Sequence, residues 1–137
     1  MSPREAHSPG WIRGQLALYF PIPAGTGAVE VLTDLIPGFK FYIEKVTAVV
    51  QVAATGSGAS RVCNIVKDTS TVVATTTYVL SDGATVGSAK AFTVTPANAE
   101  FLDGSKLSVE FPTAGAVAFT AGALMLLIQY RTRAQQL

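Results

Sequence analysis

The sequence predicts an all-β fold: a jelly-roll-like antiparallel β-sandwich of about eight strands, preceded by an extended N-terminal arm. Two patterns support this prediction. Apolar side chains alternate with a period of two over many short segments, which is typical of half-buried strands. Gly, Pro, Asn and Asp interrupt these segments about every eight to twelve residues, as in a sandwich or barrel. The chain has 137 residues, enough to enclose one core, and shows no βαβ spacing and no long helical pattern.

The first three predicted strands are apolar runs that stop at turn residues. Residues 15–20 and residues 28–33 are short runs of aliphatic and aromatic residues, each followed by a proline within a few positions. Residues 39–53 form the longest run, and its apolar residues change parity near Glu44 and Lys45. The parity change predicts a bulge or bend at this point of the strand.

The middle of the chain predicts three further strands. The Gly- and Ser-rich residues 55–60 predict a hairpin loop, and residues 61–67 form its return strand. Residues 72–80 are rich in Val and Thr, which suits a pleated surface. Residues 89–95 form another strand, and Pro96 ends it.

The last third of the chain predicts one short helical turn and two strands. Residues 96–100 begin with proline and are expected to form a single helical turn. A tight turn at residues 103–105 precedes an alternating strand at residues 106–111. The final strand, residues 117–131, is long, and Gly122 is expected to mark a bulge or a close approach of backbone within it.

Residues 1–13 differ from the rest of the chain and are expected to form the arm, with the sandwich domain at residues 14–137. The segment contains Pro, Ser and Gly without an apolar period, so it has no local reason to fold. We expect a neighbouring chain to hold the arm, with Trp11 as an apolar anchor outside the sandwich strands. The predicted partner-binding residues, at the two ends of the domain, are Trp11, Ile12, Arg13, Tyr130, Arg131 and Arg133.

Composition and charge argue against several classes of partner. Hydrophobic residues make up 49% of the chain and charged residues 14%, and this low share of charge indicates a surface suited to assembly. The net charge is +1 and the ten basic residues form no stripe with interleaved aromatics, so no nucleic-acid partner is expected. No membrane partner is expected either, because the apolar run 114–128 is short and interrupted by glycine.

The residue types that carry enzyme or metal chemistry occur only in isolation. His7, the single histidine, lies in the arm, where nothing rigid positions it for a catalytic triad. One histidine and the single cysteine, Cys63, cannot close a zinc site, and Cys63 is expected to be a core residue. The nine acidic residues are scattered, and Gly56-Ser57-Gly58 opens no phosphate-binding helix. We therefore expect no enzyme activity, no bound metal and no cofactor.

Four segments of the chain resemble the small β-sandwich proteins of tailed-bacteriophage particles. They are residues 37–50 (PGFKFYIEKVTAVV), the loop 54–59 (ATGSGA), residues 103–109 (DGSKLSV) and Thr120-Ala121-Gly122. The resemblance implies a capsid decoration (cement) protein, which binds the major capsid protein or another virion protein on the capsid surface and reinforces the shell. It also implies a homo-oligomer, with a trimer favoured, and terminal arms that reach neighbouring subunits.

Two alternative functions use the same kind of fold and remain open. One is a carbohydrate-binding or receptor-binding module of a phage fibre or tail, which needs exposed aromatic side chains beside polar groups. The other is a small jelly-roll capsid shell protein, which would assemble into closed shells by itself. The sequence contains no motif that separates either alternative from a decoration protein.

Overall fold

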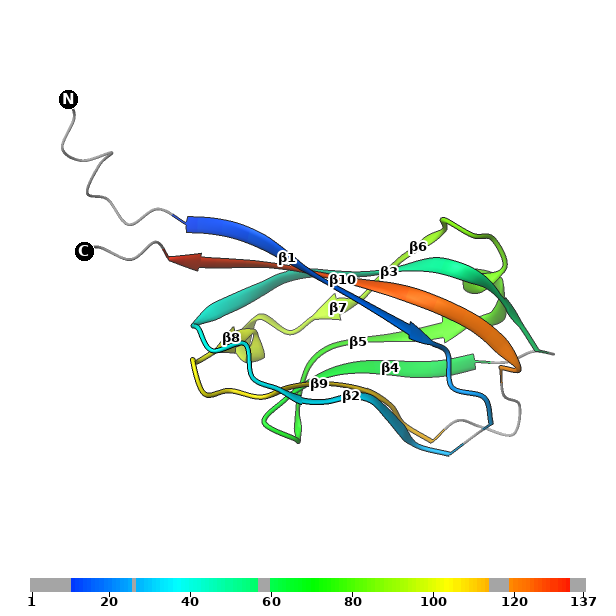
Figure 1. Ribbon diagram of the computed structural model, residues 1–137, viewed down its shortest axis with the longest axis horizontal. Coiled ribbons are helices and arrows are strands. Elements are labelled where there is room, and N and C mark those ends of the chain that lie inside the picture. The colour runs from blue at the N-terminus through cyan, green and yellow to red at the C-terminus, as the bar shows by residue number, and fades with distance from the viewer. Residues whose placement is uncertain (1–10, 26, 57–59, 114–118, 134–137) are drawn as a thin grey trace, which may run out of the picture.

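The computed structural model describes residues 11–25, 27–56, 60–113 and 119–133, which form two antiparallel β-sheets packed face to face (Figure 1). Sheet A has the strand order β1 (Trp11–Pro21), β10 (Ala121–Arg133), β3 (Phe41–Thr55) and β6 (Ala89–Ala91), and β8 (Glu100–Phe101) also pairs with β3. Sheet B has the order β2 (Val29–Leu35), β9 (Leu107–Phe111), β4 (Ser60–Lys67), β5 (Thr71–Val79) and β7 (Thr93–Val94). Two 3₁₀ helices, η1 (Leu80–Gly83) and η2 (Pro96–Asn98), lie in connections. The predicted all-β sandwich and the predicted helical turn after residue 95 are confirmed.

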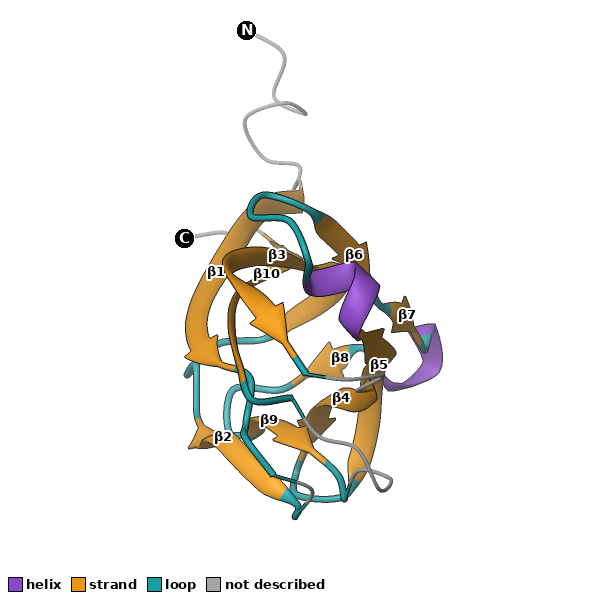
Figure 2. Cartoon of the chain, turned by 90° about the vertical axis from the view of Figure 1, so that its right-hand side faces the viewer, coloured by secondary structure: helices purple, strands orange, loops and turns teal. Residues whose placement is uncertain are grey.

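The strands pair in a nested order along the chain. β1 pairs with β10 and β3 pairs with β6 in sheet A, while β2 pairs with β9 and β4 pairs with β5 in sheet B. Successive pairs of one long antiparallel hairpin therefore alternate between the two sheets, which is the arrangement of a jelly roll, as the sequence predicted. Figure 2, which looks along the long axis, shows the two sheets curving around a common core.

The parity change in the longest strand is a β-bulge. In the ladder between β3 and β10, Gln129 lies opposite Lys45 and Tyr130 lies opposite Ile43, so Glu44 has no residue opposite it. Because one extra residue reverses the alternation, the core side of β3 carries odd-numbered residues before the bulge and even-numbered residues after it. The predicted bulge is confirmed at the predicted position.

Gly122 also occupies the predicted irregular position. Its φ is +131°, a region that side chains rarely adopt, and the register of β10 shifts between Ala121 and Ala123. A Cβ on Gly122 would lie 3.0 Å from Cα of Ala54 and 3.0 Å from Cδ1 of Ile22. The glycine therefore serves both a bulge and a close approach of neighbouring chain segments.

The predicted hairpin at residues 55–60 is wrong, because the strands on either side of it lie in different sheets. β3 belongs to sheet A, whereas β4 pairs with β5 and β9 in sheet B. Both edges of β3 are already occupied, by β10 on one side and by β6 and β8 on the other. β4 therefore has no free edge of β3 to join, and the connection crosses between the sheets.

The single strand predicted at residues 89–95 is divided between the two sheets. β6 pairs with β3, and β7 pairs with β5. Phe92 lies at the crossing, where its side chain is buried and its N–H donates to the carbonyl of Val46 at 2.9 Å. This division and the unpredicted strand β8 explain why the structure has ten strands where the sequence predicted about eight.

The predicted boundary after residue 13 falls inside a strand. β1 begins at Trp11, which lies opposite Arg133, and the ladder with β10 continues without a register shift to Pro21. Trp11 is therefore part of the sandwich and not outside it, because β10 extends to Arg133 and offers a partner for every residue from Trp11 onward. Residues 1–10 of the predicted arm, including His7, lie outside the described residues.

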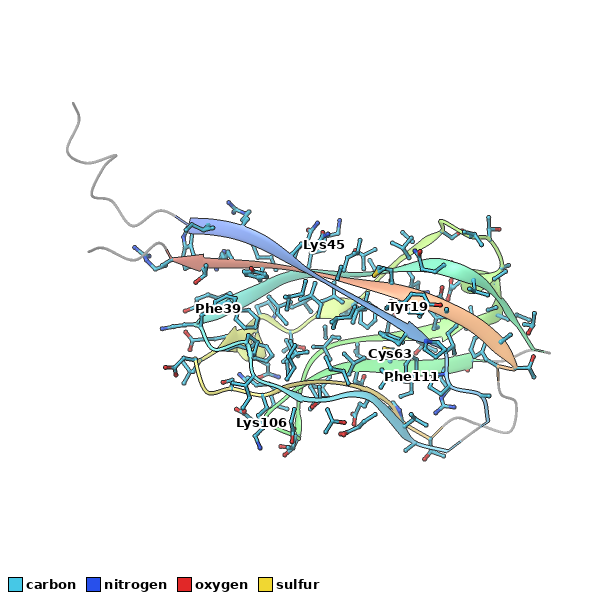
Figure 3. The ribbon with its side chains drawn as sticks, in the orientation of Figure 1. Tyr19, Phe39, Lys45, Cys63, Lys106 and Phe111 are labelled. Atoms are coloured by element: carbon cyan, nitrogen blue, oxygen red, sulfur yellow. The ribbon has the colours of Figure 1, made fainter. Side chains whose placement is uncertain are left out.

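The core lies between the two sheets and is mainly aromatic and aliphatic. Phe41 and Phe101 stack with ring centroids 4.8 Å apart, and Phe20 meets Phe111 edge to face at 5.6 Å. Cys63 is 1% exposed, which confirms its predicted place in the core, and burial together with the charge of Glu110 raises the pKa of its thiol to about 12. Figure 3 shows Cys63 and Phe111 between the sheets.

Candidate functional site

The outer face of sheet B is mainly polar, although Val62 and Val79 are also exposed on it, and its polar side chains make hydrogen bonds with one another. Thr75 Oγ1 donates to Oδ1 of Asn64 at 2.6 Å, and Nδ2 of Asn64 donates to Oε1 of Glu110 at 3.3 Å. These three residues lie opposite one another on β5, β4 and β9, so their side chains share one face. On the neighbouring edge strand β2, Glu30 lies opposite Glu110 and accepts a hydrogen bond from Thr33. A face of this kind is well suited to water.

The outer face of sheet A carries an uncharged patch across four strands. Tyr19 lies opposite Met125, Met125 lies opposite Val49, and Val49 lies opposite Ala89, so these side chains form one row. A second, parallel row consists of Ala17, Leu127, Thr47 and Ala91. All eight residues are half-buried or exposed, and Tyr19 is 58% exposed. We call these eight residues the apolar patch.

A cluster of arginine and aromatic side chains lies toward the ends of β1 and β10, separated from the apolar patch by the polar row of Gln15, Gln129 and Lys45. The guanidinium of Arg131 lies 4.7 Å from the ring centroid of Trp11 and 5.3 Å from that of Tyr42. Arg133 lies 5.1 Å from the ring of Trp11, and Trp11 meets Tyr42 edge to face at 5.7 Å. These are cation–π distances, so the two arginines and the two rings stabilise one another.

Glu44 joins this cluster and separates two like charges. Arg13 and Arg131 lie directly opposite each other on β1 and β10, an arrangement that is unfavourable on its own. Glu44 Oε1 lies 3.1 Å from Nε of Arg13, and Glu44 Oε2 lies 3.6 Å from Nη1 of Arg131. The bulge in β3 therefore supplies the carboxylate that lets two arginines occupy neighbouring positions. We call Trp11, Arg13, Tyr42, Glu44, Arg131 and Arg133 the terminal cluster.

The structure brings together four of the six residues predicted to bind a partner. Trp11, Arg13, Arg131 and Arg133 belong to the terminal cluster. Tyr130 faces the sandwich, with its ring 5.6 Å from Phe39 and 5.4 Å from Phe41. Ile12 lies opposite Thr132, off the row that carries Trp11 and Arg13, and is 54% exposed.

Sequence reasoning missed Tyr42, Glu44 and the apolar patch as parts of a site. The signal for the first two was present, because Tyr42 has the parity opposite to the core residue Phe41 and Glu44 lies at the parity change. The apolar patch could not be found in this way, because its residues come from four strands whose order the sequence does not reveal.

Beside the terminal cluster lies a shallow cleft of about 790 Å³. Aromatic rings of Trp11, Phe39 and Tyr42 line it together with the charged side chains of Lys40 and Asp103. The remaining lining residues are Gly38, Leu102, Thr132 and Arg133. Aromatic and charged groups thus meet in one concave surface.

A short hydrogen bond joins the cluster to β8. The hydroxyl of Tyr42 donates to Oε2 of Glu100 at 2.5 Å, and Nζ of Lys40 lies 3.3 Å from the same oxygen. These two contacts, the hydroxyl first, hold the pKa of Glu100 below its ordinary value of 4.5. The same hydrogen bond raises the pKa of Tyr42 above 10.0, because an ionised hydroxyl could not donate it.

We expect Tyr42→Phe to destabilise the protein at neutral pH and to do so less in acid. Glu100 has a lowered pKa in the folded state, so its contribution is present above pH 4.5 and is lost as the pH falls through the folded-state pKa. The measurement is the difference in Tm between wild type and Tyr42→Phe from about pH 7 to about pH 3, a range that spans the ordinary pKa of a glutamate side chain. Tyr19→Phe, which alters an exposed hydroxyl, is the control and should show no such trend. An equal Tm difference at every pH would contradict the assignment.

The described residues contain no group of three or more His, Cys, Asp or Glu side chains placed to hold one metal ion. Within the same residues, no helix is long and apolar enough to span a bilayer.

Comparison of the chain with protein-family models, curated proteins and solved structures gave no match. A functional assignment therefore depends on the fold and on the side chains of sheet A.

Proposed function

We propose that this chain is a structural virion protein that binds the outside of a phage capsid and reinforces it. The observation that carries the proposal is the chemical difference between the two outer faces of the sandwich. Sheet B presents mainly polar side chains that are hydrogen-bonded to one another, with Val62 and Val79 exposed among them. Sheet A presents the apolar patch and, beyond the polar row of Gln15, Gln129 and Lys45, the terminal cluster. One face suited to water and one suited to a protein surface are what a protein needs to coat a shell.

In this proposal the apolar patch supplies affinity and the terminal cluster supplies orientation. Each Å² of apolar surface removed from water contributes roughly 25 cal/mol, and an interface of ordinary size buries about 800 Å² per partner. Part of that gain is offset by the loss of translational and rotational freedom. Trp11 and arginine are residue types that often dominate binding energy, and Arg133, which forms no ion pair among the described residues, would pair with a carboxylate of the shell.

The repeating shell is the second element of the mechanism. A capsid offers many equivalent sites, so a protein that contacts two shell subunits at once strengthens their association at every site it occupies. Jelly rolls occur in viral capsid proteins and also in lectins, so the fold supports this proposal by analogy alone. The proposal assigns the chain no catalytic step, cofactor, nucleic-acid partner or membrane.

A carbohydrate-binding module is the second candidate, and the cleft beside the terminal cluster favours it. Trp11, Phe39 and Tyr42 beside Asp103 and Lys40 form the mixture of rings and polar groups that sugar sites use. It ranks second because Arg131 and Arg133 already lie over the ring of Trp11, where a sugar ring would stack. Binding of the purified protein to a glycan array, lost in Trp11→Ala, would favour this candidate over the first.

The apolar patch is tested by adding single charges to it. Leu127→Lys and Ala91→Lys place an ammonium group on the outer face of sheet A, and each is expected to weaken binding to purified phage particles at least about tenfold, or 1.4 kcal/mol. Binding is measured by co-sedimentation of the purified protein with particles of the phage that encodes it, stripped of this chain.

Thr77→Lys is the matched control, because Thr77 is exposed on the outer face of sheet B. It should bind as wild type does, and all three variants should unfold at similar temperatures. If the sheet A variants bind like the control, the docking face has been misassigned. Closed shells formed by the purified protein alone would instead favour the small capsid shell protein.

A further inference from the structure

The sandwich has two long edge strands, and they differ in how well they are protected. β2, at the edge of sheet B, has two register shifts in its ladder and carries Glu30 and Asp34, the latter with a positive φ of 52°. Bulges and charges of this kind discourage further pairing. β1, at the edge of sheet A, has eleven residues in unbroken register with β10, and Arg13 is its one charged residue. Figure 2 shows β1 along the outline of the molecule.

The residues of β1 that direct backbone groups toward the free edge can be identified. The N–H of Ile22 donates to the carbonyl of Gly122 at 2.9 Å, one step beyond the pair Pro21 and Ala123. Because bonded and non-bonded pairs alternate in an antiparallel ladder, even-numbered residues of β1 bond to β10 and odd-numbered residues point away from it. Pro21, which has no N–H, occupies an odd position, as proline does on an edge strand.

We infer that the free edge of β1 pairs with β1 of a second copy of this chain, antiparallel across a twofold axis at Leu16. In this register all eleven residues are paired, and the odd-numbered residues of one copy face those of the other. The single charge, on Arg13, lies opposite Tyr19 of the second copy and not opposite another arginine. Ala17 and Tyr19 would then join the apolar patches of both copies into one surface.

A second copy of β1 is favoured because the other free edges in the described part of the chain are irregular or short: β2 has seven residues with two register shifts. The opposite edge of sheet A consists of β6, with three residues, and β8, with two. A cyclic trimer built through β1 would have to pair it with that short edge or with the irregular, charged edge of β2, since each subunit of a ring uses two different surfaces. Pairing β1 with β1 uses the same surface twice and closes at two subunits, so the expected assembly is a dimer in place of the trimer that the phage resemblance implies.

The first test removes one free-edge donor without touching the ladder to β10. Ala17→Pro deletes an N–H that points to the free edge, while Ala17→Val adds a branched side chain and keeps that N–H. Sedimentation equilibrium of the full chain should give twice the monomer mass for wild type and Ala17→Val. Ala17→Pro should raise the dimer dissociation constant at least tenfold. A monomer or a trimer at all concentrations of wild type would overturn the inference.

The second test does not depend on how well the proline variant folds. In the inferred register, Leu16 lies opposite Leu16 of the second copy in a non-bonded pair, where Cα atoms are about 4.5 Å apart, within disulfide range. Leu16→Cys should therefore form a covalent dimer on mild oxidation. Gln15→Cys should not, because the two copies of residue 15 lie two positions out of register.

Cys63 does not interfere with this test, because it is buried with a pKa of about 12. Cross-linking through Gln15→Cys in place of Leu16→Cys would move the twofold axis by one residue and overturn the register. If neither cysteine variant cross-links and Ala17→Pro still forms dimers, the dimer interface does not lie at the free edge of β1, and the inference is overturned. Both tests use the protein alone, so their outcome is independent of whether it binds a capsid.

Discussion

Arg61→Ala is expected to lower the free energy of unfolding by about 3–5 kcal/mol. Arg61, the second residue of β4, is 1% exposed, and its guanidinium lies 5.9 Å from the ring of Phe111. Its Nη1 donates to the carbonyl of Gly25 at 2.6 Å, and its Nη2 donates to the carbonyls of Gly27 and Phe111. Alanine would leave these carbonyls without their donor and a cavity beside Phe111.

The contacts of Arg61 explain why the effect should be large. They tie the connection between β1 and β2, which crosses from sheet A to sheet B, to the strands β4 and β9. Among the described residues no carboxylate bonds to Arg61, so backbone dipoles accept its hydrogen bonds, and burial lowers the pKa of the guanidinium. Arg61 thus joins the connection between β1 and β2 to the core through the hydrogen bonds that its guanidinium donates.

Urea unfolding followed by circular dichroism measures this loss. Arg61→Lys keeps the charge but not the planar fork of donors, so it should recover only part of the stability. Arg13→Ala, which removes an arginine from an exposed ion pair, should cost less than about 1 kcal/mol. Equal losses for Arg61→Ala and Arg13→Ala would show that the buried contacts contribute little.

Phe41→Ala is expected to lower the free energy of unfolding by about 3–5 kcal/mol. Phe41 is fully buried, its ring is stacked on that of Phe101, and the ring of Tyr130 meets it edge to face at 5.4 Å. Removing the ring leaves a cavity that the rigid sheet around it cannot close. The stacked pair also lies under the terminal cluster, since Phe41 and Tyr42 are consecutive residues on opposite faces of β3.

Urea unfolding again supplies the measurement, with fluorescence of Trp11, the single tryptophan, as a second signal. Phe41→Leu should cost clearly less than Phe41→Ala, because leucine refills part of the space. If the buried ring of Phe41 positions the terminal cluster above it, the fluorescence of Trp11 should differ between folded wild type and folded Phe41→Ala. A loss below about 1 kcal/mol would mean that the site collapses and refills itself.

The strands themselves could be predicted because their patterns are local. Alternation located β3, and the parity change at Glu44 located its bulge, since both depend on neighbouring residues alone. Gly122 was identified in the same way. In each of these features the residues of the segment itself determine the backbone conformation.

Features that depend on distant partners could not be predicted. A Gly- and Ser-rich loop forms a hairpin or a crossing between sheets equally well, so only the occupied edges of β3 decide where β4 pairs. Trp11, Ile12 and Arg13 have no apolar period, and they become a strand because β10 extends opposite them.

The candidate site shows the same division between local and distant effects. The arginines and Trp11 could be predicted as candidate binding residues from their residue type, and the structure brings them together because the first and last strands pair in full register. The apolar patch, by contrast, consists of ordinary strand residues of four separate segments. Their shared face follows from strand order, which no stretch of sequence contains.

The pairing of β1 with β10 also determines how the molecule responds to tension. Trp11 and Arg133 lie opposite each other, so the chain enters and leaves the sandwich at the same end (Figure 1). A force that pulls the two ends apart would break the hydrogen bonds between β1 and β10 one after another. We therefore expect β1 to separate from the sheet at low force. A force applied across the faces of the sandwich would instead be shared by all strands of a sheet, so the molecule should resist it better than a force applied to its two ends.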